Sequence, residues 1–214
     1  VIRYLFEKGV GLDQANNEGV TATYKAASNG HVDVVRYFAE NAANLNKAAN
    51  DGATPTYVAA WKGHVDVVRY LAENGANLNQ AATDGATPTF IAARSGHLGV
   101  VRYLKEKGSN INQAMNDGVT PVMAAALNGH TEMVLYLIRH GADLGTVVHG
   151  LSARLAAVLG GRTEVVHLLD SIAHAGGWRK YVGERRRRYC RIRQSLSTTY
   201  QTLSESHPDR QLLH

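Results

Sequence analysis

The sequence has a single cysteine, Cys190, among its 214 residues. One thiol cannot form an internal disulfide, and such low cysteine usage is compatible with a reducing compartment. No apolar run approaches the length of a membrane span. The chain begins at Val1 without the charged and then apolar pattern of a secretory signal peptide. We therefore expect a cytoplasmic protein without a membrane span, and we interpret the sequence as a fragment or processed piece.

The sequence also lacks the short motifs that mark many enzymes. It contains no Gly-x-Gly-x-x-Gly, no Gly-Lys-Ser/Thr phosphate loop, no His-Glu-x-x-His and no pair of cysteines. We therefore predict no catalytic residues, no metal site and no cofactor.

Positive charge is concentrated near the end of the sequence. Residues 1–175 hold 14 Lys/Arg and 15 Asp/Glu, a net charge of −1, whereas residues 176–214 hold 9 and 3, a net charge of +6. The basic character of the whole chain thus belongs to its last 39 residues.

What the sequence does have is an internal repeat. Gly19, Gly52, Gly85 and Gly118 each stand in a similar context, and each lies 33 residues after the one before. A constant period of this size is typical of stacked repeat proteins.

Each repeat predicts two short helices. Thr54 is a good N-cap and Pro55 suits the first helical position, so we expect a first helix over about residues 55–62 that stops at Gly63. In the second helix, Val67, Val68 and Leu71 form a narrow apolar stripe. Neither helix is long enough to be stable alone, so their apolar faces must be buried against the neighbouring repeats.

The repeated residues resemble those of the ankyrin repeat. Asp-Gly-x-Thr-Pro is followed by Ala-Ala, Gly-His, Val-Val, Leu and Gly-Ala, most completely from Asp51 to Ala76 and from Asp117 to Ala142. The resemblance extends from residue 1 to about 173. It implies an all-α solenoid of L-shaped helix pairs, with hairpin-like loops around residues 43–50, 76–83 and 109–116 that project to one side.

The period divides the sequence into repeats. We predict a partial repeat at 1–16, full repeats at 17–49, 50–82, 83–115 and 116–148, and a degenerate closing repeat at 149–175. Because the partial repeat lacks its first half, we expect either further repeats upstream or a frayed end.

Two departures from the family pattern lead to predictions about packing and stability. Thr56-Tyr57, Thr89-Phe90 and Val122-Met123 replace the usual Leu-His, so aromatic or thioether packing should replace the histidine's hydrogen bonds. Ala42 stands where the other repeats end in glycine. A left-handed backbone is unfavourable for alanine, so Ala42→Gly should stabilise the protein.

Histidine, arginine and tyrosine also recur at the 33-residue period. His31, His64, His97 and His130 should lie about 10 Å apart in successive repeats, too far to share a zinc ion, so we interpret them as structural. The ladders are Arg3, Arg36, Arg69 and Arg102, and Tyr4, Tyr37, Tyr70, Tyr103 and Tyr136. They allow a basic stripe for nucleic acid, but spacing to nearby acidic residues favours ion pairs within each helix.

The resemblance to ankyrin repeats implies binding of a protein partner through loop tips and exposed positions of the first helices, which line a concave groove. The matching residues are Glu18, Val20, Ser28, Asn29, Asn50, Ala53, Trp61, Lys62, Thr83, Ala86, Arg94, Ser95, Asn116, Val119, Leu127 and Asn128. Trp61 is either an interface hot spot or a side chain folded onto its neighbours. We expect a monomer that acts as a non-catalytic scaffold or adaptor, or as the targeting arm of a larger enzyme or signalling protein.

The basic segment reads as an amphipathic helix followed by a disordered tail from Ser195 to His214. Its apolar face comprises Trp178, Val182, Tyr189, Ile192 and Leu196, and its basic residues are Arg179, Lys180, Arg185, Arg186, Arg187, Arg188, Arg191 and Arg193. We favour a cap on the last repeat for residues 178–182 and a solvated arginine run beyond it that serves nuclear import. The alternatives for the arginine run are contact with nucleic acid and binding to an acidic membrane or a calmodulin-like partner.

Overall fold

The computed structural model describes residues 11–185 and 187. In this part of the chain the elements are helices, with two isolated β-bridges, Ala15 to Thr21 and Val148 to Leu151. The helices are α2 (Ala22–Ser28), α3 (Val32–Glu40), α4 (Pro55–Lys62), α5 (Val65–Glu73), α6 (Pro88–Arg94), α7 (Leu98–Glu106), α8 (Pro121–Asn128), α9 (Thr131–Arg139), α10 (Ala153–Leu159) and α11 (Thr163–His174).

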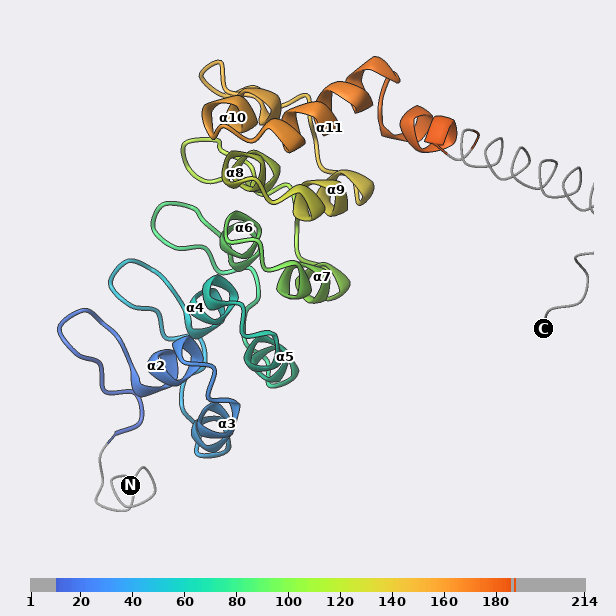
Figure 1. Cartoon of the computed structure of the whole chain (residues 1–214). Helices are drawn as coiled ribbons and strands as arrows, with labels where there is room; N and C mark the ends of the chain where they lie inside the picture. Colours follow the sequence, from blue (N-terminus) through green and yellow to red (C-terminus); the bar gives the residue numbers. More distant parts are fainter. Residues whose placement is uncertain (1–10, 186, 188–214) are drawn as a thin grey trace, which may run out of the picture. The chain divides into compact units, whose positions relative to one another are not determined.

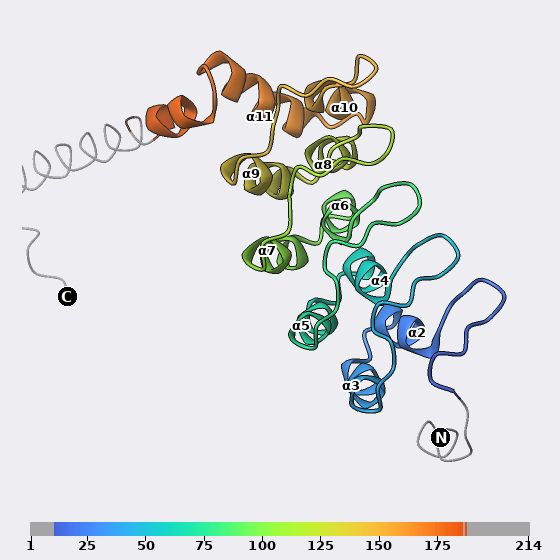
Figure 2. The same ribbon diagram turned by 180° about the vertical axis from the view of Figure 1, so that it is seen from behind.

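The helices of the first compact unit form two parallel rows. The chain divides into two units, Val1–Val166 and His167–His214. In the first unit, α2, α4, α6, α8 and α10 stack side by side in chain order as an inner row. The outer row consists of α3, α5, α7 and α9 (Figures 1 and 2). The predicted all-α repeat solenoid is therefore confirmed.

The inner helices begin at the predicted caps. Thr54 has an extended backbone, and its hydroxyl oxygen accepts a hydrogen bond from the Tyr57 N–H at 3.1 Å. Pro55 follows at the first helical position, and the helix ends at Gly63 with a φ of 80°. In α10 the N-cap is a serine, and the Ser152 hydroxyl oxygen accepts a hydrogen bond from the Leu155 N–H at 3.2 Å.

Buried alanines allow the inner helices to approach closely. Ala59, Ala60, Ala92 and Ala93 have no exposed surface. The outer helices contribute larger apolar side chains to the core, such as Val68 and Leu71 in α5. Small side chains on one row and larger ones on the other fill the space between the rows, as the apolar stripes predict.

A loop that we call a finger connects each outer helix to the next inner helix. The fingers project to one side of the inner row (Figure 1). The Ala49 N–H donates to the carbonyl of Ala53 at 2.9 Å, which closes a turn at residues 50–52. Equivalent bonds run from Ala82 to Ala86 and from Met115 to Val119. The tips thus lie slightly beyond the predicted loop ranges, because the chain continues extended until the Asp-Gly turn reverses it.

The second unit contains a further helix. Residues 178–185 are helical, and the ring of Trp178 lies 5.7 Å from that of Tyr181. The Arg185 guanidinium lies 5.6 Å from the centre of the Tyr181 ring. The remaining basic residues at 186 and 188–193, the apolar positions beyond 187, and the predicted disorder at 195–214 fall outside the described residues. None of the described helices combines the length and apolarity needed to cross a bilayer.

Candidate functional site

The fingers and the inner helices meet in a corner that runs along the stack. Phe90 of α6 is buried there between Ala86 of its own finger and Ala124 of the next inner helix. Tyr57, the equivalent residue of the preceding repeat, packs against the same cluster, as do Met115 and Val119 of a finger. The predicted replacement of the usual histidine by aromatic packing is therefore confirmed, and the side of each inner helix that carries these residues faces the fingers.

One helical turn beyond this corner, each inner helix carries a side chain in the same position. A residue four places later lies on the same helix face, so Trp61 continues the side of Tyr57 and Leu127 continues that of Met123. We call Ser28, Trp61, Arg94, Leu127 and Leu159 the helix-end row. Trp61 is 41% exposed, Leu127 42% and Leu159 69%, although large apolar side chains are usually hidden. Three large apolar side chains of the row are therefore exposed to solvent.

The backbone beneath Trp61 is held by the next repeat. The His97 Nε2–H donates to the carbonyl oxygen of Trp61 at 2.9 Å. Gly63 leaves room for the imidazole, since a Cβ at this position would lie 2.6 Å from His97 Nδ1. The Lys62 ammonium lies 4.3 Å from the centre of the Trp61 indole, within the range of a cation–π contact. The indole is thus accessible and attached to a fixed helix end.

The same bond recurs along the stack. His64 Nε2 donates to the carbonyl of Ser28 at 3.1 Å, and His130 Nε2 donates to that of Arg94 at 3.0 Å. In the last repeat the Arg162 Nε–H replaces histidine and donates to the carbonyl of Leu127 at 3.1 Å. Each of these side chains therefore locks the helix-end row of the preceding repeat, which supports the structural interpretation of the histidines.

The fingertips carry one carboxylate per repeat. We call Glu18, Asp51, Asp84 and Asp117 the fingertip row, and all four are exposed. The Asp51 Oδ1 accepts from the Ala53 N–H at 2.9 Å, and Asp84 and Asp117 make the same turn contact. Neighbouring tips are joined by backbone bonds, such as that from the Thr83 N–H to the Asp51 carbonyl at 2.8 Å. The carboxylates are consequently held in register.

The fingertip carboxylates help to raise the pKa values of two tyrosines, Tyr57 and Tyr24. Burial, followed by the negative charge of Asp84, raises the pKa of Tyr57 to about 12, and the nearby Arg94 partly opposes this. Burial, followed by the carboxylates of Asp51 and Glu18, also raises the pKa of Tyr24. The phenols therefore stay protonated and able to donate a hydrogen bond through the physiological range.

A family model described as ankyrin repeats (3 copies) matches residues 1–82, 77–148 and 114–175. The chain belongs to the ankyrin-repeat family. Ankyrin repeats are generally protein–protein interaction modules and are typically non-catalytic. A search of curated proteins finds no match to the sequence.

The positions carried over from other ankyrin repeats divide into exposed and buried ones. Exposed are Glu18, Asn29, Asn50, Trp61, Lys62, Thr83, Arg94, Asn116, Leu127 and Asn128, and partly buried are Val20, Ser28, Ser95 and Val119. Ala53 and Ala86 are only 1% exposed, so the expectation that they lie on the surface is wrong. Each follows the Asp-Gly turn where the chain re-enters the ankyrin stack, and its methyl group is covered there.

The arginine ladder of the outer ankyrin helices makes contacts that the sequence analysis did not predict. The Arg36 guanidinium lies 5.2 Å from the centre of the Tyr70 ring, Arg69 lies 5.2 Å from Tyr103, and Arg102 lies 5.7 Å from Tyr136. Within the described residues, these arginines form no ion pair with the acidic residues of their own helices. The prediction of ion pairs within each helix is therefore wrong, because each guanidinium reaches the tyrosine of the following ankyrin repeat instead.

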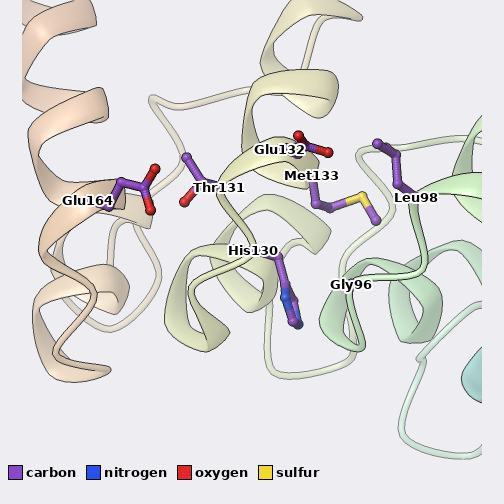
Figure 3. A pocket seen from close by; sticks show the side chains of 7 residues that line it. All are labelled: Gly96, Leu98, His130, Thr131, Glu132, Met133 and Glu164. Atoms are coloured by element: carbon purple, nitrogen blue, oxygen red, sulfur yellow. The ribbon is translucent and has the colours of Figure 1, made fainter.

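A hollow of about 310 Å³ lies where three ankyrin repeats turn from inner to outer helices. Figure 3 shows it lined by Gly96, Leu98, His130, Thr131, Glu132, Met133 and Glu164. His130 is already engaged with the carbonyl of Arg94. In the part of the chain that the structure describes, no three His, Cys, Asp or Glu side chains are arranged to hold a metal ion.

Sequence reasoning missed the apolar surface of α10. Leu155 is 39% and Val158 46% exposed. The residues equivalent to Val158 in the other ankyrin repeats, Ala27, Ala60, Ala93 and Ala126, have no exposed surface. Replacement of this alanine by valine was the available signal, because a closely packed ankyrin helix pair has no room for the larger side chain.

Proposed function

We propose that this chain is a non-catalytic binding module that grips a protein partner in the groove between its fingers and its inner helices. The observation that carries the proposal is the helix-end row, in which Trp61, Leu127 and Leu159 remain exposed at equivalent positions. Exposed large apolar side chains in a fixed arrangement are typical of interaction surfaces.

Trp61 is the anchor on which the proposal depends most. Tryptophan is enriched among residues that contribute most to binding energy, and such residues act best when they are held in place before the partner arrives. The bond from His97 to the Trp61 carbonyl fixes the backbone that carries this side chain, and the contact with Lys62 restricts the indole itself in the free protein. Little conformational freedom then remains to be lost on binding.

The proposal is tested in two stages. Partners are first captured from a cell extract on the immobilised array and identified, and one purified partner is then titrated against wild type, Trp61→Ala and Leu127→Ala. Truncation of a hot-spot residue costs 2 kcal/mol or more, so Trp61→Ala should weaken binding by at least about thirtyfold. Leu127→Ala should weaken it by a smaller factor.

Glu106→Gln provides the control, because this residue is exposed on the outer row at the end of α7. It should bind like wild type. Equal affinity of Trp61→Ala, Leu127→Ala and wild type for the same partner would overturn the proposal, provided that circular dichroism shows both variants to be folded.

A further inference from the structure

The fingertip row and the helix-end row differ in chemistry. The four tip stretches, residues 17–20, 50–53, 83–86 and 116–119, contain four carboxylates and no lysine or arginine. The helix-end row contributes exposed apolar surface from Trp61 and Leu127. A segment that contacts both rows must therefore present cationic groups on one edge and apolar groups on another.

From this arrangement we propose that the groove binds an extended partner segment in which Lys or Arg recurs at every third residue. The segment would direct its cationic edge to the fingertip row and its apolar residues to the helix-end row. This inference rests on the proposed function and adds to it the chemistry and the spacing of the partner.

The spacing follows from how the repeats are stacked. Packed helices lie about 8–10 Å apart, so the fingertip carboxylates recur at about that interval. The backbone bonds from Asn50 to Glu18, from Thr83 to Asp51 and from Asn116 to Asp84 fix the interval along the row. In the polyproline II conformation, every third residue returns to the same edge after about 9.3 Å. Each cationic residue on that edge would therefore lie next to one carboxylate of the fingertip row.

Three of the fingertip carboxylates each have an oxygen available to accept a hydrogen bond from a partner. In Asp51, Asp84 and Asp117, Oδ1 accepts a hydrogen bond within its own turn. The second oxygen of each is left to accept from a lysine or arginine. Charge-assisted contacts of this kind add specificity to an interface whose affinity comes mainly from apolar anchors.

The positive charges of Arg94 and Lys62 raise the alternative of an acidic partner segment. Both lie on the helix-end side, where Lys62 is held over the Trp61 ring. A strongly acidic segment would meet the carboxylates of the fingertip row as well as these two cations, and the repulsion would offset the attraction that the cations contribute. A cationic segment meets four carboxylates across an edge that carries no positive charge.

The test uses two labelled peptides with the same composition. One has four copies of Lys-Leu-Pro, which places lysine at every third position, and the other has its four lysines grouped at one end. Fluorescence anisotropy gives the affinity of the intact array for each peptide at about 50 and about 200 mM salt. The periodic peptide should bind more tightly than the grouped one, and more weakly at the higher salt concentration.

Charge neutralisation supplies a matched pair of variants. Asp51→Asn, Asp84→Asn and Asp117→Asn together remove three fingertip charges and keep the side-chain oxygen that closes each turn. Glu40→Gln, Glu73→Gln and Glu106→Gln together remove three exposed charges with the same 33-residue spacing from the outer helices. The first set should weaken binding of the periodic peptide about tenfold, and the second should leave it within about twofold of wild type.

Equal binding of the two peptides, or equal effects of the two sets of variants, would overturn the inference. Either result would leave the proposed function standing if Trp61→Ala still weakens binding of the captured partner. Failure of Trp61→Ala would instead remove the proposed function itself, so the two failures are distinguishable.

Discussion

The Nε2 atom of His97 lies 2.9 Å from the carbonyl oxygen of Trp61 in the preceding repeat. This bond joins two repeats and also holds the helix end that carries the candidate anchor. His97→Ala should therefore lower the free energy of unfolding by about 1 kcal/mol and loosen the end of α4. Urea unfolding measures the first effect, and a shift of tryptophan emission to longer wavelength measures the second.

His31→Ala is the control for this prediction. His31 precedes α3 as His97 precedes α7, but it makes no such bond to a described residue. Its removal should have less effect on stability. Equal losses for His31→Ala and His97→Ala would show that the bond to the Trp61 carbonyl contributes nothing measurable.

Two buried threonines at the start of α4 should respond in opposite ways to the same substitution. Thr54 and Thr56 are both fully buried, but only the Thr54 hydroxyl has a partner, the Tyr57 N–H. The Thr56 hydroxyl has none. Thr54→Val should cost about 1 kcal/mol through loss of the cap, whereas Thr56→Val should stabilise by about 1 kcal/mol because a buried, unpaired hydroxyl is removed.

The urea midpoints of these two variants check the prediction. Since valine and threonine have nearly the same shape, cavity effects are small in both cases. A loss of stability in Thr56→Val would indicate that its hydroxyl is hydrogen-bonded in solution.

Ala42 has a left-handed backbone with a φ of 62°, as its place at the glycine position predicts. Ala42→Gly should raise the free energy of unfolding by about 1 kcal/mol. Gly75 is the equivalent residue of the next repeat, with a φ of 80° and no atom within 4 Å of an added Cβ. Gly75→Ala should therefore cost about as much as Ala42→Gly gains, and thermal unfolding of both variants tests this symmetry.

The regular part of the fold could be predicted because it is encoded within each repeat. The Thr-Pro cap and the glycine stop gave the bounds of α4, and the apolar stripe gave the buried residues of α5. Contacts between repeats were harder to predict. Arg69 has acidic residues within one helical turn, yet it contacts Tyr103 because the stacking distance brings that ring within reach.

Tyr57 should make stability fall at alkaline pH. Burial and the carboxylate of Asp84 raise its pKa to about 12 from 10.0. Between these values the unfolded chain releases the phenol proton while the folded chain retains it, so rising pH favours unfolding. The loss should stay below about 1 kcal/mol at pH 11, since the side chain is partly solvated.

Tyr57→Phe should remove this contribution and lose less stability than wild type between pH 8 and pH 11. The difference between the tyrosinate absorbance titrations of wild type and Tyr57→Phe isolates the one phenol. Its midpoint should lie near 12, and a midpoint near 10 would contradict the described environment of Tyr57.

The candidate site was predicted only in part. Trp61 stood out because the other repeats place smaller or charged residues there, and it is exposed. Ala53 and Ala86 were placed wrongly, because a family position does not tell how far a methyl group is covered by the next finger. The exposure of Leu155 and Val158 depends on α10 being the last inner helix of its unit, which periodicity alone does not reveal.

The central claim is that Trp61 is exposed in the free array and is covered by the partner. It is tested most directly by fluorescence of a Trp178→Phe variant, in which Trp61 is the remaining tryptophan. Titration with the purified partner should shift its emission to shorter wavelength and reduce quenching by acrylamide. If emission and quenching stay unchanged at saturation, the partner does not occupy the groove and the account is contradicted.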